Sequence, residues 1–401
     1  MISSVHLTHG QRTASPVRFG EQQAQAVRQF HRSFPEYAPT PLIRLDALAK
    51  SLGVARISVK DESYRFGLNA FKVLGGSYAI GNVIAEKLGI HPAALSYSLL
   101  TSPATAEKLG KLTFVTATDG NHGRGVAWTA NRLGMNCVVY LPRGSAQERL
   151  MNIRALGAQA TITDLNYDDA VRLANRMAEE NGWIMVQDTA WEGYESIPTW
   201  IMQGYTTMAL EAWEQLAGEK PTHIFLQAGV GAMAGAVTGF FADLFGEERP
   251  IITIVEPEQA DCLFRSAKAG ALRCVSGDLK TIMAGLACGE PCTVGWQMLQ
   301  NYADFFISMS DEYAAQGMRV LGNPLPGDPR VISGESGAAT VGLVSALLRD
   351  PAQADLRQQL GLDAHSRILC FSTEGDTDRE NYRRVVWEGL YPSCSGADAG
   401  R

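Results

Sequence analysis

Short apolar runs alternate with longer stretches of helical periodicity through most of the chain. The runs are rich in Val, Ile, Leu and Phe, which is typical of buried strands, and turn-forming residues separate them from the helical stretches. The predicted strands are residues 112–116, 137–141, 160–163, 183–186, 223–227, 251–256 and 367–372. The predicted helices include residues 126–132, 146–156 and 167–180. This alternation indicates βαβ units, and therefore mainly parallel sheets that helices cover on both faces.

The predicted strands form two series, separated near residues 190–220. We therefore expect two α/β domains: a smaller one at residues 85–215, inserted into a larger one formed by residues 1–84 and 216–401. Ligands of parallel sheets bind beyond the carboxyl ends of the strands. The loops that follow the strands are therefore the first places to look for chemistry.

Composition and charge narrow the class of protein. The 401 residues are 46% hydrophobic and 19% charged, which fits a globular chain. A net charge of −7 without a basic stripe argues against nucleic-acid binding. The chain contains neither an apolar run of about 18 residues nor the apolar core of a signal peptide. We expect a cytoplasmic protein that acts on a small molecule, with no membrane segment.

Cysteine usage points to a reducing compartment. The seven cysteines are odd in number and lack compact spacing. They form no zinc-ligand pattern with histidine, so we expect no metal site. Whether Cys262 and Cys288 form a disulfide is left open by the sequence.

Glycine is in excess. Its 40 copies are about 10% of the chain, where about 7% is usual. Glycine permits tight turns and a close approach of the backbone to a ligand. We expect the glycines in and beside the motifs described below to cluster around one ligand; these are Gly75, Gly76, Gly120, Gly123, Gly125, Gly229, Gly231, Gly235 and Gly375.

Lys72 begins a helical pattern of small and apolar residues, between Phe71 and Val73. Partly desolvated surroundings favour the neutral amine, which a Schiff base requires. A lysine that buries its stem on the apolar face of an ordinary helix fits the same pattern.

A second motif, residues 116–125 (TATDGNHGRG), follows a predicted strand with a Gly-rich turn and a helix start. Backbone N–H groups and the helix dipole at such a turn suit a carboxylate or a phosphate. Asp119 would repel that anion, so it either caps the helix, accepts a proton or holds an ammonium group. His122 is expected to be structural.

Two further motifs follow strands. Residues 227–235 (QAGVGAMAG) form a Gly-rich loop that suits a monophosphate. It is not a Walker loop, and the third glycine of a dinucleotide loop falls one residue late. Residues 371–376 place Ser372 and Thr373 at a strand end, where a hydroxyl either donates to a ring nitrogen or caps a turn.

The order of these motifs resembles that of the fold-type II pyridoxal-phosphate enzymes, over roughly residues 40–390. Within that group, residues 68–72 (LNAFK) and 118–125 (TDGNHGRG) resemble the diaminopropionate ammonia-lyases. Related dehydratases carry Ser and Ala where this chain has Ala70 and Asp119. Residues 186–191, 334–339 and 372–376 add to the similarity. The resemblance implies a tryptophan synthase β-like α/β fold: two three-layer domains with mainly parallel sheets and the cofactor between them.

The resemblance also implies how pyridoxal 5′-phosphate binds. Lys72 would hold it as a Schiff base, and Asn121 would hydrogen-bond the ring 3′-oxygen. Thr373, or Ser372 in the alternative register, would contact the ring nitrogen. The phosphate would bind the backbone of the Gly-rich loop, namely Gly229, Val230, Gly231, Ala232, Met233 and Gly235.

The implied reaction is α,β-elimination of 2,3-diaminopropionate, as D and L isomers, to pyruvate and ammonia by way of aminoacrylate. It would be a step of amino acid catabolism, and the enzymes of this group are usually homodimers. Asp119 and Asp188 would hold the β-ammonium group through charge-assisted hydrogen bonds, with Thr118 and Gly120 in the same substrate site. Because the α-protons of the two enantiomers point to opposite faces, we expect Lys72 to serve the L isomer and Asp119 the D isomer.

Four alternatives stay open at this point. A serine or threonine dehydratase of the same fold would eliminate water and leave Asp119 with less to do. A cysteine-synthase-like β-replacement enzyme is disfavoured for the same reason. A non-enzymatic metabolite-binding protein would be expected to lack the lysine or the phosphate loop. A nicotinamide dehydrogenase is disfavoured by the late third glycine.

Overall fold

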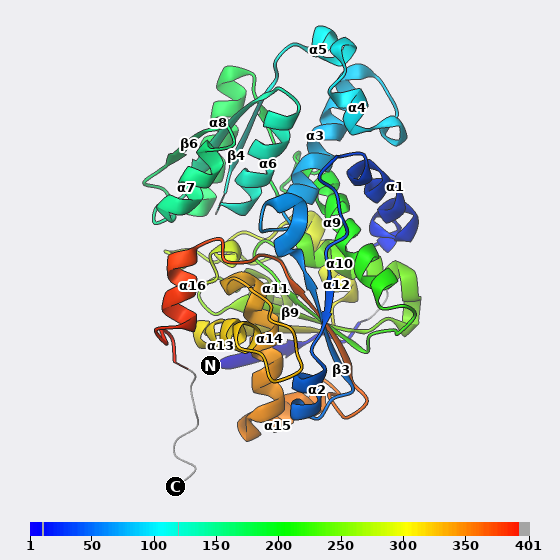
Figure 1. Cartoon of the computed structure of the whole chain (residues 1–401), viewed down its shortest axis with the longest axis vertical. Coiled ribbons are helices and arrows are strands. Elements are labelled where there is room, and N and C mark those ends of the chain that lie inside the picture. Colours follow the sequence, from blue (N-terminus) through cyan, green and yellow to red (C-terminus); the bar gives the residue numbers. More distant parts are fainter. Residues whose placement is uncertain (10–11, 119, 393–401) are drawn as a thin grey trace.

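The structure, a computed structural model, describes residues 1–9, 12–118 and 120–392 (Figure 1). Asp119, which the sequence analysis singled out, lies outside the described residues. The described strands form two sheets, and helices surround both of them.

The larger sheet has seven strands in the order β1-β10-β9-β8-β11-β3-β2. Its inner strands are parallel, whereas the edge strands β1 and β2 run antiparallel to their neighbours. The strands are β1 (Ile2–His6), β2 (Leu42–Arg44), β3 (Arg56–Asp61), β8 (His223–Gln227), β9 (Ile251–Pro257), β10 (Phe305–Met309) and β11 (Arg367–Ser372).

The smaller sheet has four strands in the order β6-β5-β4-β7, and all its pairs are parallel. The strands are β4 (Thr113–Ala117), β5 (Asn136–Leu141), β6 (Gln159–Ile162) and β7 (Ile184–Met185). In Figure 1 this sheet lies in the upper part of the molecule with α6, α7 and α8, and the larger sheet lies below it.

The helices of the N-terminal half are α1 (Glu21–Arg32), α2 (Asp46–Leu52), α3 (Val73–Leu88), α4 (Tyr97–Leu100), α5 (Pro103–Leu109), α6 (Asn121–Arg132), α7 (Gln147–Arg154) and α8 (Tyr167–Asn181). Those of the C-terminal half are α9 (Ser196–Gln215), α10 (Ala232–Phe245), α11 (Cys262–Ala269), α12 (Thr293–Tyr302), α13 (Asp311–Gly322), α14 (Glu335–Arg349), α15 (Ala354–Gln359) and α16 (Arg379–Val386). None of the helices in the described part of the chain is long and apolar enough to cross a membrane.

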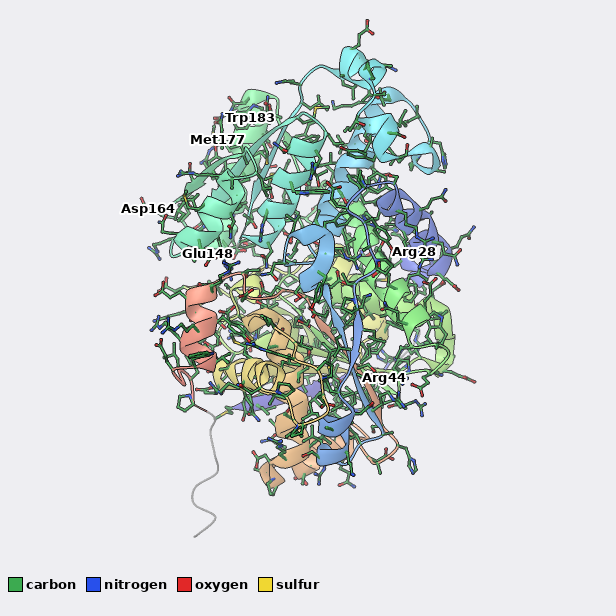
Figure 2. All side chains as sticks on the ribbon, viewed as in Figure 1. Arg28, Arg44, Glu148, Asp164, Met177 and Trp183 are labelled. Atoms are coloured by element: carbon green, nitrogen blue, oxygen red, sulfur yellow. The ribbon has the colours of Figure 1, made fainter. Side chains whose placement is uncertain are left out.

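The larger sheet is buried on both faces, as its continuous apolar strands require. Along β8, Ile224 and Leu226 belong to one core cluster and Phe225 belongs to another. The helix α14 lies on β8 and β11 on the side of Phe225, and α13 packs against α14. Charged side chains such as Arg44 and Asp164 are exposed at the surface (Figure 2).

All the strands predicted from the sequence are present, and the limits predicted for β8 and β11 coincide with those observed. Four strands escaped prediction: β1, β2, β3 and β10. Charged residues interrupt the apolar pattern of β3, because Lys60 and Asp61 are buried there beside polar partners. The local pattern could not reveal those partners, which come from other parts of the chain or from backbone groups.

The strands of the smaller sheet all lie within the predicted smaller domain, and those of the larger sheet lie outside it. The predicted limits at residues 85 and 215 stay a prediction. The helix α9, which precedes the second limit, packs against α1, α3 and α10.

One buried histidine of α1, His31, makes the stability of the folded chain depend on pH. His31 is fully buried; its Nε2 donates to Leu74 O at 3.0 Å, because a carbonyl can only accept. Its Nδ1 therefore accepts from Thr207 Oγ1 at 2.8 Å. Burial lowers the pKa of His31 to about 3, so the ring is neutral in the folded chain and protonates on unfolding below its ordinary pKa of 6.5.

We predict that His31 makes the folded chain less stable as the pH falls from 6.5. Between pH 7 and pH 5 the wild type should lose about 2 kcal/mol more unfolding free energy than His31→Gln, since each unit below 6.5 contributes about 1.4 kcal/mol. Urea unfolding at both pH values measures the difference. The exposed His365→Gln serves as control and should follow the wild type; an identical pH dependence of His31→Gln and wild type would contradict the prediction.

Candidate active site

A pocket lies where strands of both sheets end. Its wall includes residues that follow β8 and β11 of the larger sheet, and residues that follow β4 and β7 of the smaller one. The N-terminal ends of α3, α6 and α10 meet there. It brings together most of the predicted site residues, namely Lys72, Asn121, Asp188, Gly229, Val230, Gly231, Ala232, Met233 and Thr373.

Lys72 and Asp188 form an ion pair in this pocket. Lys72 immediately precedes α3, and its Nζ donates to Asp188 Oδ2. The side chain of Lys72 is 17% exposed and that of Asp188 only 4%, so the pair is reached from the pocket and largely shielded elsewhere. The family resemblance implies roles for both residues in the same reaction, and the structure places them in contact.

The surroundings of Asp188 stabilise its negative charge. Asp188 Oδ1 accepts from the hydroxyl of Tyr167 and the amide of Gln187, each at 3.3 Å. His122 Nδ1 lies 3.9 Å from Oδ2, while its Nε2 contacts Val186 O at 2.8 Å. Burial by itself raises the pKa of Asp188, but His122 and Lys72 together lower it well below its ordinary value. Asp188 is therefore a charged carboxylate beside an amine.

Backbone contacts on two sides fix the position of Lys72. On one side, Phe71 N donates to Thr373 O at 3.1 Å, and Gly375 N donates to Asn69 O at 3.0 Å. On the other side, a Cβ added to Gly125 would lie 2.7 Å from Val73 Cα, so only glycine lets α6 approach the start of α3 this closely. The end of β11 and the helix α6 thus enclose the segment that carries the lysine.

The loop between β8 and α10 has the form of an anion cradle. Gly231 caps the start of α10 with a φ of +93°, a conformation that residues with a side chain rarely adopt. A Cβ on Gly229 would lie 3.1 Å from Cys288 Sγ and 3.2 Å from Gly285 O. The first turn of α10 carries no acidic residue. Its N–H groups and the helix dipole therefore face the pocket without a competing negative charge.

The structure separates the two hydroxyls of the β11 end. Thr373 lines the pocket, and its Oγ1 accepts from Gln227 Nε2 at 2.8 Å. Ser372 is fully buried, and its Oγ contacts Ser333 Oγ at 2.8 Å instead. Because successive side chains of a strand alternate in direction, only Thr373 is available to a pocket ligand.

Glu374 is a pocket residue to which the sequence analysis gave no role. This buried carboxylate accepts from Asn121 Nδ2, from Ser336 N at 3.2 Å and from Thr377 Oγ1 at 3.2 Å. Burial and the charge of Glu374 raise the pKa of the neighbouring Glu335 to about 7. The partners of Glu374 come mostly from distant segments, so the sequence held only one signal for this residue, its position directly after Thr373. Tyr167, which donates to Asp188, was likewise missed.

Three predicted site residues that the structure describes do not line the pocket. Thr118 Oγ1 accepts from Gly120 N at 3.0 Å and from Gly123 N at 2.9 Å, so it caps the start of α6. Gly120 takes part in the same cap. Gly235 lies one turn inside α10, where a Cβ would meet Gly295 Cα at 2.9 Å. Its small size therefore serves the packing of α10 on α12.

The expectation that nine glycines cluster around one ligand is wrong in large part. Of these nine, Gly229 and Gly231 line the pocket. A Cβ on Gly75 would lie 2.6 Å from side-chain atoms of Ile201 and Tyr205, so Gly75 lets α3 pack closely on α9. The excess of glycine thus reflects close helix packing as much as ligand binding.

The two cysteines left open by the sequence flank the loop after β8. Cys262 Sγ lies 3.8 Å from Gly229 O, and Cys288 lines the pocket. No disulfide joins them. Burial and the nearby Glu256 raise the pKa of Cys262 well above its ordinary value, so its sulfur is a thiol.

These features fit pyridoxal phosphate. A lysine amine, a cradle of backbone N–H groups and the hydroxyl of Thr373 share one pocket, and these groups suit the aldehyde, the phosphate and the ring nitrogen of the cofactor in turn. Among the described residues, no group of His, Cys, Asp and Glu is arranged to hold a metal ion.

Comparison with known proteins agrees with this geometry. The family model of pyridoxal-phosphate dependent enzymes matches residues 34–370. The diaminopropionate ammonia-lyase of Escherichia coli K12 is 55% identical over 375 residues, which are 93% of this chain and 93% of that protein. A biosynthetic L-threonine dehydratase of Salmonella typhimurium is only 25% identical, over 81% of this chain and 56% of that protein.

Solved structures show the same similarity. The holo diaminopropionate ammonia-lyase from Escherichia coli has a TM-score of 0.93 and 51% identity, with 99% of both chains covered. The same enzyme in complex with an aminoacrylate–PLP azomethine reaction intermediate has a TM-score of 0.91 and 51% identity, with 98% of both chains covered. The family-model match, the identity over nearly the whole length and the shared fold lead to one conclusion: the chain belongs to the pyridoxal-phosphate dependent enzymes of fold type II, in the group of diaminopropionate ammonia-lyases.

Proposed function

We propose that this chain catalyses the pyridoxal-phosphate-dependent α,β-elimination of 2,3-diaminopropionate, as D and L isomers, to pyruvate and ammonia. One observation carries the proposal: the Lys72–Asp188 ion pair and the β8–α10 loop line the same pocket, in a chain that is 55% identical to a diaminopropionate ammonia-lyase. The rival, a serine or threonine dehydratase, is less well supported, because the threonine dehydratase is only 25% identical.

Lys72 and Asp188 supply the proton chemistry in this proposal. Bound pyridoxal phosphate supplies an electron sink for the electrons that remain when the α-proton leaves. Lys72 Nζ, at the pocket wall, takes the α-proton of the L isomer. Asp188 Oδ2 accepts from Lys72 and can accept from a substrate ammonium in the same way. Because its pKa is lowered, Asp188 stays charged and keeps the β-nitrogen protonated, which makes that nitrogen a better leaving group.

Two polar residues orient the ring in this proposal. Thr373 Oγ1 already accepts from Gln227, so its own O–H proton remains to be donated to a ring nitrogen. A neutral hydroxyl leaves that nitrogen largely unprotonated, which favours elimination over transamination. Asn121, held by Glu374, would hydrogen-bond the ring 3′-oxygen.

Asp119 has the role of the second base in this proposal. Its position in the sequence, between the capping residue Thr118 and the pocket residue Asn121, supports that assignment. Asp119 would take the α-proton of the D isomer, and it would share the β-ammonium group with Asp188. Thr118 and Gly120 would support Asp119 from the adjoining turn rather than contact the substrate directly.

We further propose a cytoplasmic homodimer that acts in amino acid catabolism. The family resemblance supports the dimer, and the absence of a membrane-spanning helix from the described residues is compatible with the location. The assignment of residues 85–215 to a smaller domain is part of the same proposal, supported by the location of β4 to β7 within that range.

The substrate assignment predicts the ranking of four compounds. D- and L-diaminopropionate should release pyruvate faster than D- and L-serine, because Asp188 offers its charge to a β-ammonium group that serine lacks. A coupled assay of pyruvate with each compound separately measures the ranking. Faster release from either serine isomer than from both diaminopropionate isomers would instead support the dehydratase.

Removal of the lysine amine should strongly reduce turnover. We predict that Lys72→Ala lowers kcat for the L isomer by on the order of 10²–10⁴-fold, the usual contribution of a positioned base. The D isomer should be slowed as well, because both isomers need the cofactor that Lys72 would hold. The matched control is Lys87→Ala, which removes an exposed lysine from the last turn of the same helix. Borohydride reduction followed by mass spectrometry should find the cofactor on Lys72; attachment to another lysine would contradict the assignment.

The two-base hypothesis predicts an isomer-specific defect. Asp119→Asn should reduce turnover of the D isomer by on the order of 10²-fold or more and spare the L isomer, because only the D isomer depends on that base. Asp188→Asn is the matched variant and should slow both isomers alike. Equal losses of D and L turnover in Asp119→Asn would rule out two bases.

A further inference from the structure

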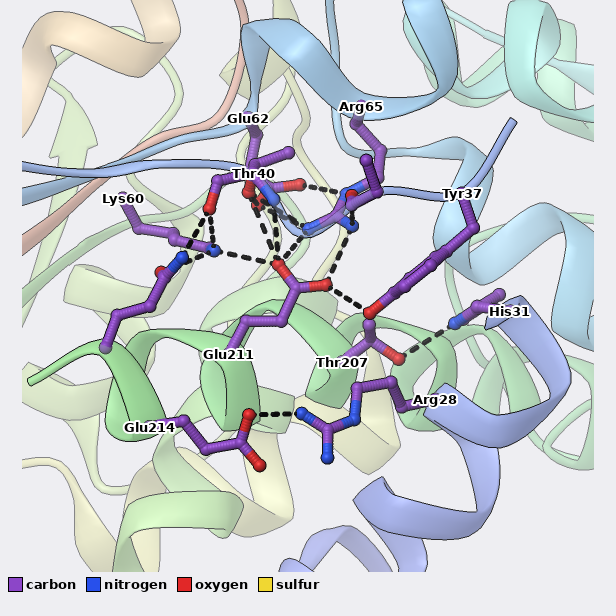
Figure 3. A network of polar contacts seen from close by, with 12 residues as sticks. Arg28, His31, Tyr37, Thr40, Lys60, Glu62, Arg65, Thr207, Glu211 and Glu214 are labelled. Atoms are coloured by element: carbon purple, nitrogen blue, oxygen red, sulfur yellow. Dashed lines mark hydrogen bonds and ion pairs between the residues drawn. The ribbon is translucent and has the colours of Figure 1, made fainter. Parts of the chain in front are cut away.

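Four charged side chains that the proposed reaction does not use are buried together beside residues 66–71, the stretch that leads to Lys72 and is here called the lysine segment. They are Lys60 of β3, Glu62 and Arg65 of the 3-10 turn that follows it (Glu62–Gly67), and Glu211 of α9. Each is at most 1% exposed. Figure 3 shows these residues, here called the ion cluster, around the carboxylate of Glu211.

The Arg65 guanidinium joins the two carboxylates of the ion cluster. Toward Glu62 it donates from Nε at 2.8 Å and from Nη2 at 2.9 Å. Toward Glu211 it donates from Nη1 at 2.9 Å and from Nη2 at 2.7 Å. Paired contacts on both sides use the planar fork of arginine and fix its direction, which the single ammonium group of lysine cannot do.

The remaining polar groups of the ion cluster are satisfied as well. Lys60 Nζ donates to Glu211 Oε2 at 2.8 Å and to Thr40 O at 2.6 Å. Thr40 Oγ1 donates to Glu62 Oε1 at 2.6 Å. Burial raises the pKa of Glu211, but Arg65 and Lys60 outweigh it and lower the pKa to about 2. Two positive and two negative charges therefore balance in the interior.

Stability alone is a poor explanation for this arrangement. Apolar residues of similar volume often stabilise a fold at least as well as a buried ion network, because charges lose their hydration. Such a network fixes the position of its members, since each partner holds the others in one geometry. The ion cluster can therefore fix the position of the chain segment that adjoins it.

The ion cluster lies at the start of the segment that leads to Lys72. Directly after Arg65, Phe66 has a φ of +50°, and Asn69 has a φ of +59°. Asparagine tolerates this left-handed conformation, but for a bulky residue such as Phe66 it is unfavourable and persists only where the surroundings impose it. The hydrogen bonds of Asn69 and Phe71 to the β11 end fix the far end of the segment. Arg65 fixes the near end by tying it to α9.

We propose that Arg65, clamped by Glu62 and Glu211, is a positioning residue for Lys72. It anchors the segment 66–71 to α9, and the segment in turn delivers the lysine amine to Asp188 and to the β8–α10 loop. The inference rests on the proposed role of Lys72. Arg65 itself does not line the pocket, so it acts through the segment and not on the substrate.

The test is Arg65→Lys, which keeps the charge and removes the fork. Lysine cannot hold both carboxylates in paired contacts, so the segment should shift. Since a displacement of about 1 Å can cost about 10²-fold in rate, we expect kcat for diaminopropionate to fall about tenfold, with KM within about twofold. After cofactor removal and readdition of pyridoxal phosphate, formation of the borohydride-trapped adduct at Lys72 should slow by a similar factor.

The matched control is Arg28→Lys. Arg28 contacts Glu214 of the same helix α9, but Glu214 is 51% exposed and the pair does not contact the lysine segment. A surface pair contributes little, so this variant should match the wild type in both measurements. If Arg65→Lys lowers only the melting temperature, with kcat and the trapping rate unchanged, the ion cluster is structural support and the inference is overturned.

A second variant covers the case in which Arg65→Lys does not fold. Thr40→Val conserves the shape and removes the hydroxyl that contacts Glu62 and, at 3.1 Å, Arg65 Nη2. It should lower kcat and the trapping rate together by a few-fold, and wild-type values for both would overturn the inference. A wild-type chain that forms no adduct at Lys72 would instead contradict the proposed function itself.

Discussion

The ion pair between Lys72 and Asp188 is the interaction on which the pocket depends. Lys72 belongs to the segment between β3 and α3, whereas Asp188 follows β7 of the other sheet. A carboxylate that is almost fully buried requires a counter-charge and hydrogen bonds, and the amine, Tyr167 and Gln187 provide them. The ends of the two sheets therefore come together at the Lys72–Asp188 pair, and this pair forms part of the pocket wall.

Close backbone packing holds Lys72 at the pocket wall. The helix α3, which begins directly after Lys72, packs on α6 and α9 with no room for side chains at the crossings. A Cβ on Gly125 would meet Val73, and one on Gly204 would lie 2.4 Å from Leu74 O. Interiors packed at this density transmit small displacements. The ion cluster acts on the same segment from the side of β3.

The two buried carboxylates of the pocket are in different situations. Glu374 accepts from Asn121, Ser336 and Thr377, and its hydrogen bonds are directed into the protein. Asp188 instead accepts from the amine of Lys72. Under the proposed function that amine would carry the cofactor, and of these two carboxylates Asp188 would then be the one that faces a substrate ammonium. The difference supports the proposal of an amine leaving group.

The sequence by itself determined the local units of this protein. Apolar runs, Gly-rich turns and helix starts follow one another at short range, and that was enough to predict the strands of the smaller sheet, the loop after β8 and the lysine. Short-range patterns could not reveal the partners of charged residues, so β3, Glu374 and the ion cluster were missed. They also assigned too many glycines to the ligand, because a glycine between two helices and a glycine beside a phosphate look alike in one dimension.

Only the tertiary structure decided that Asp188 meets Lys72 across 116 positions of the chain and that Thr373 lines the pocket while Ser372 points away from it. The physical reason is that the sequence fixes which groups lie near one another along the chain, whereas the packing of the two sheets decides which of them share a low-dielectric interior.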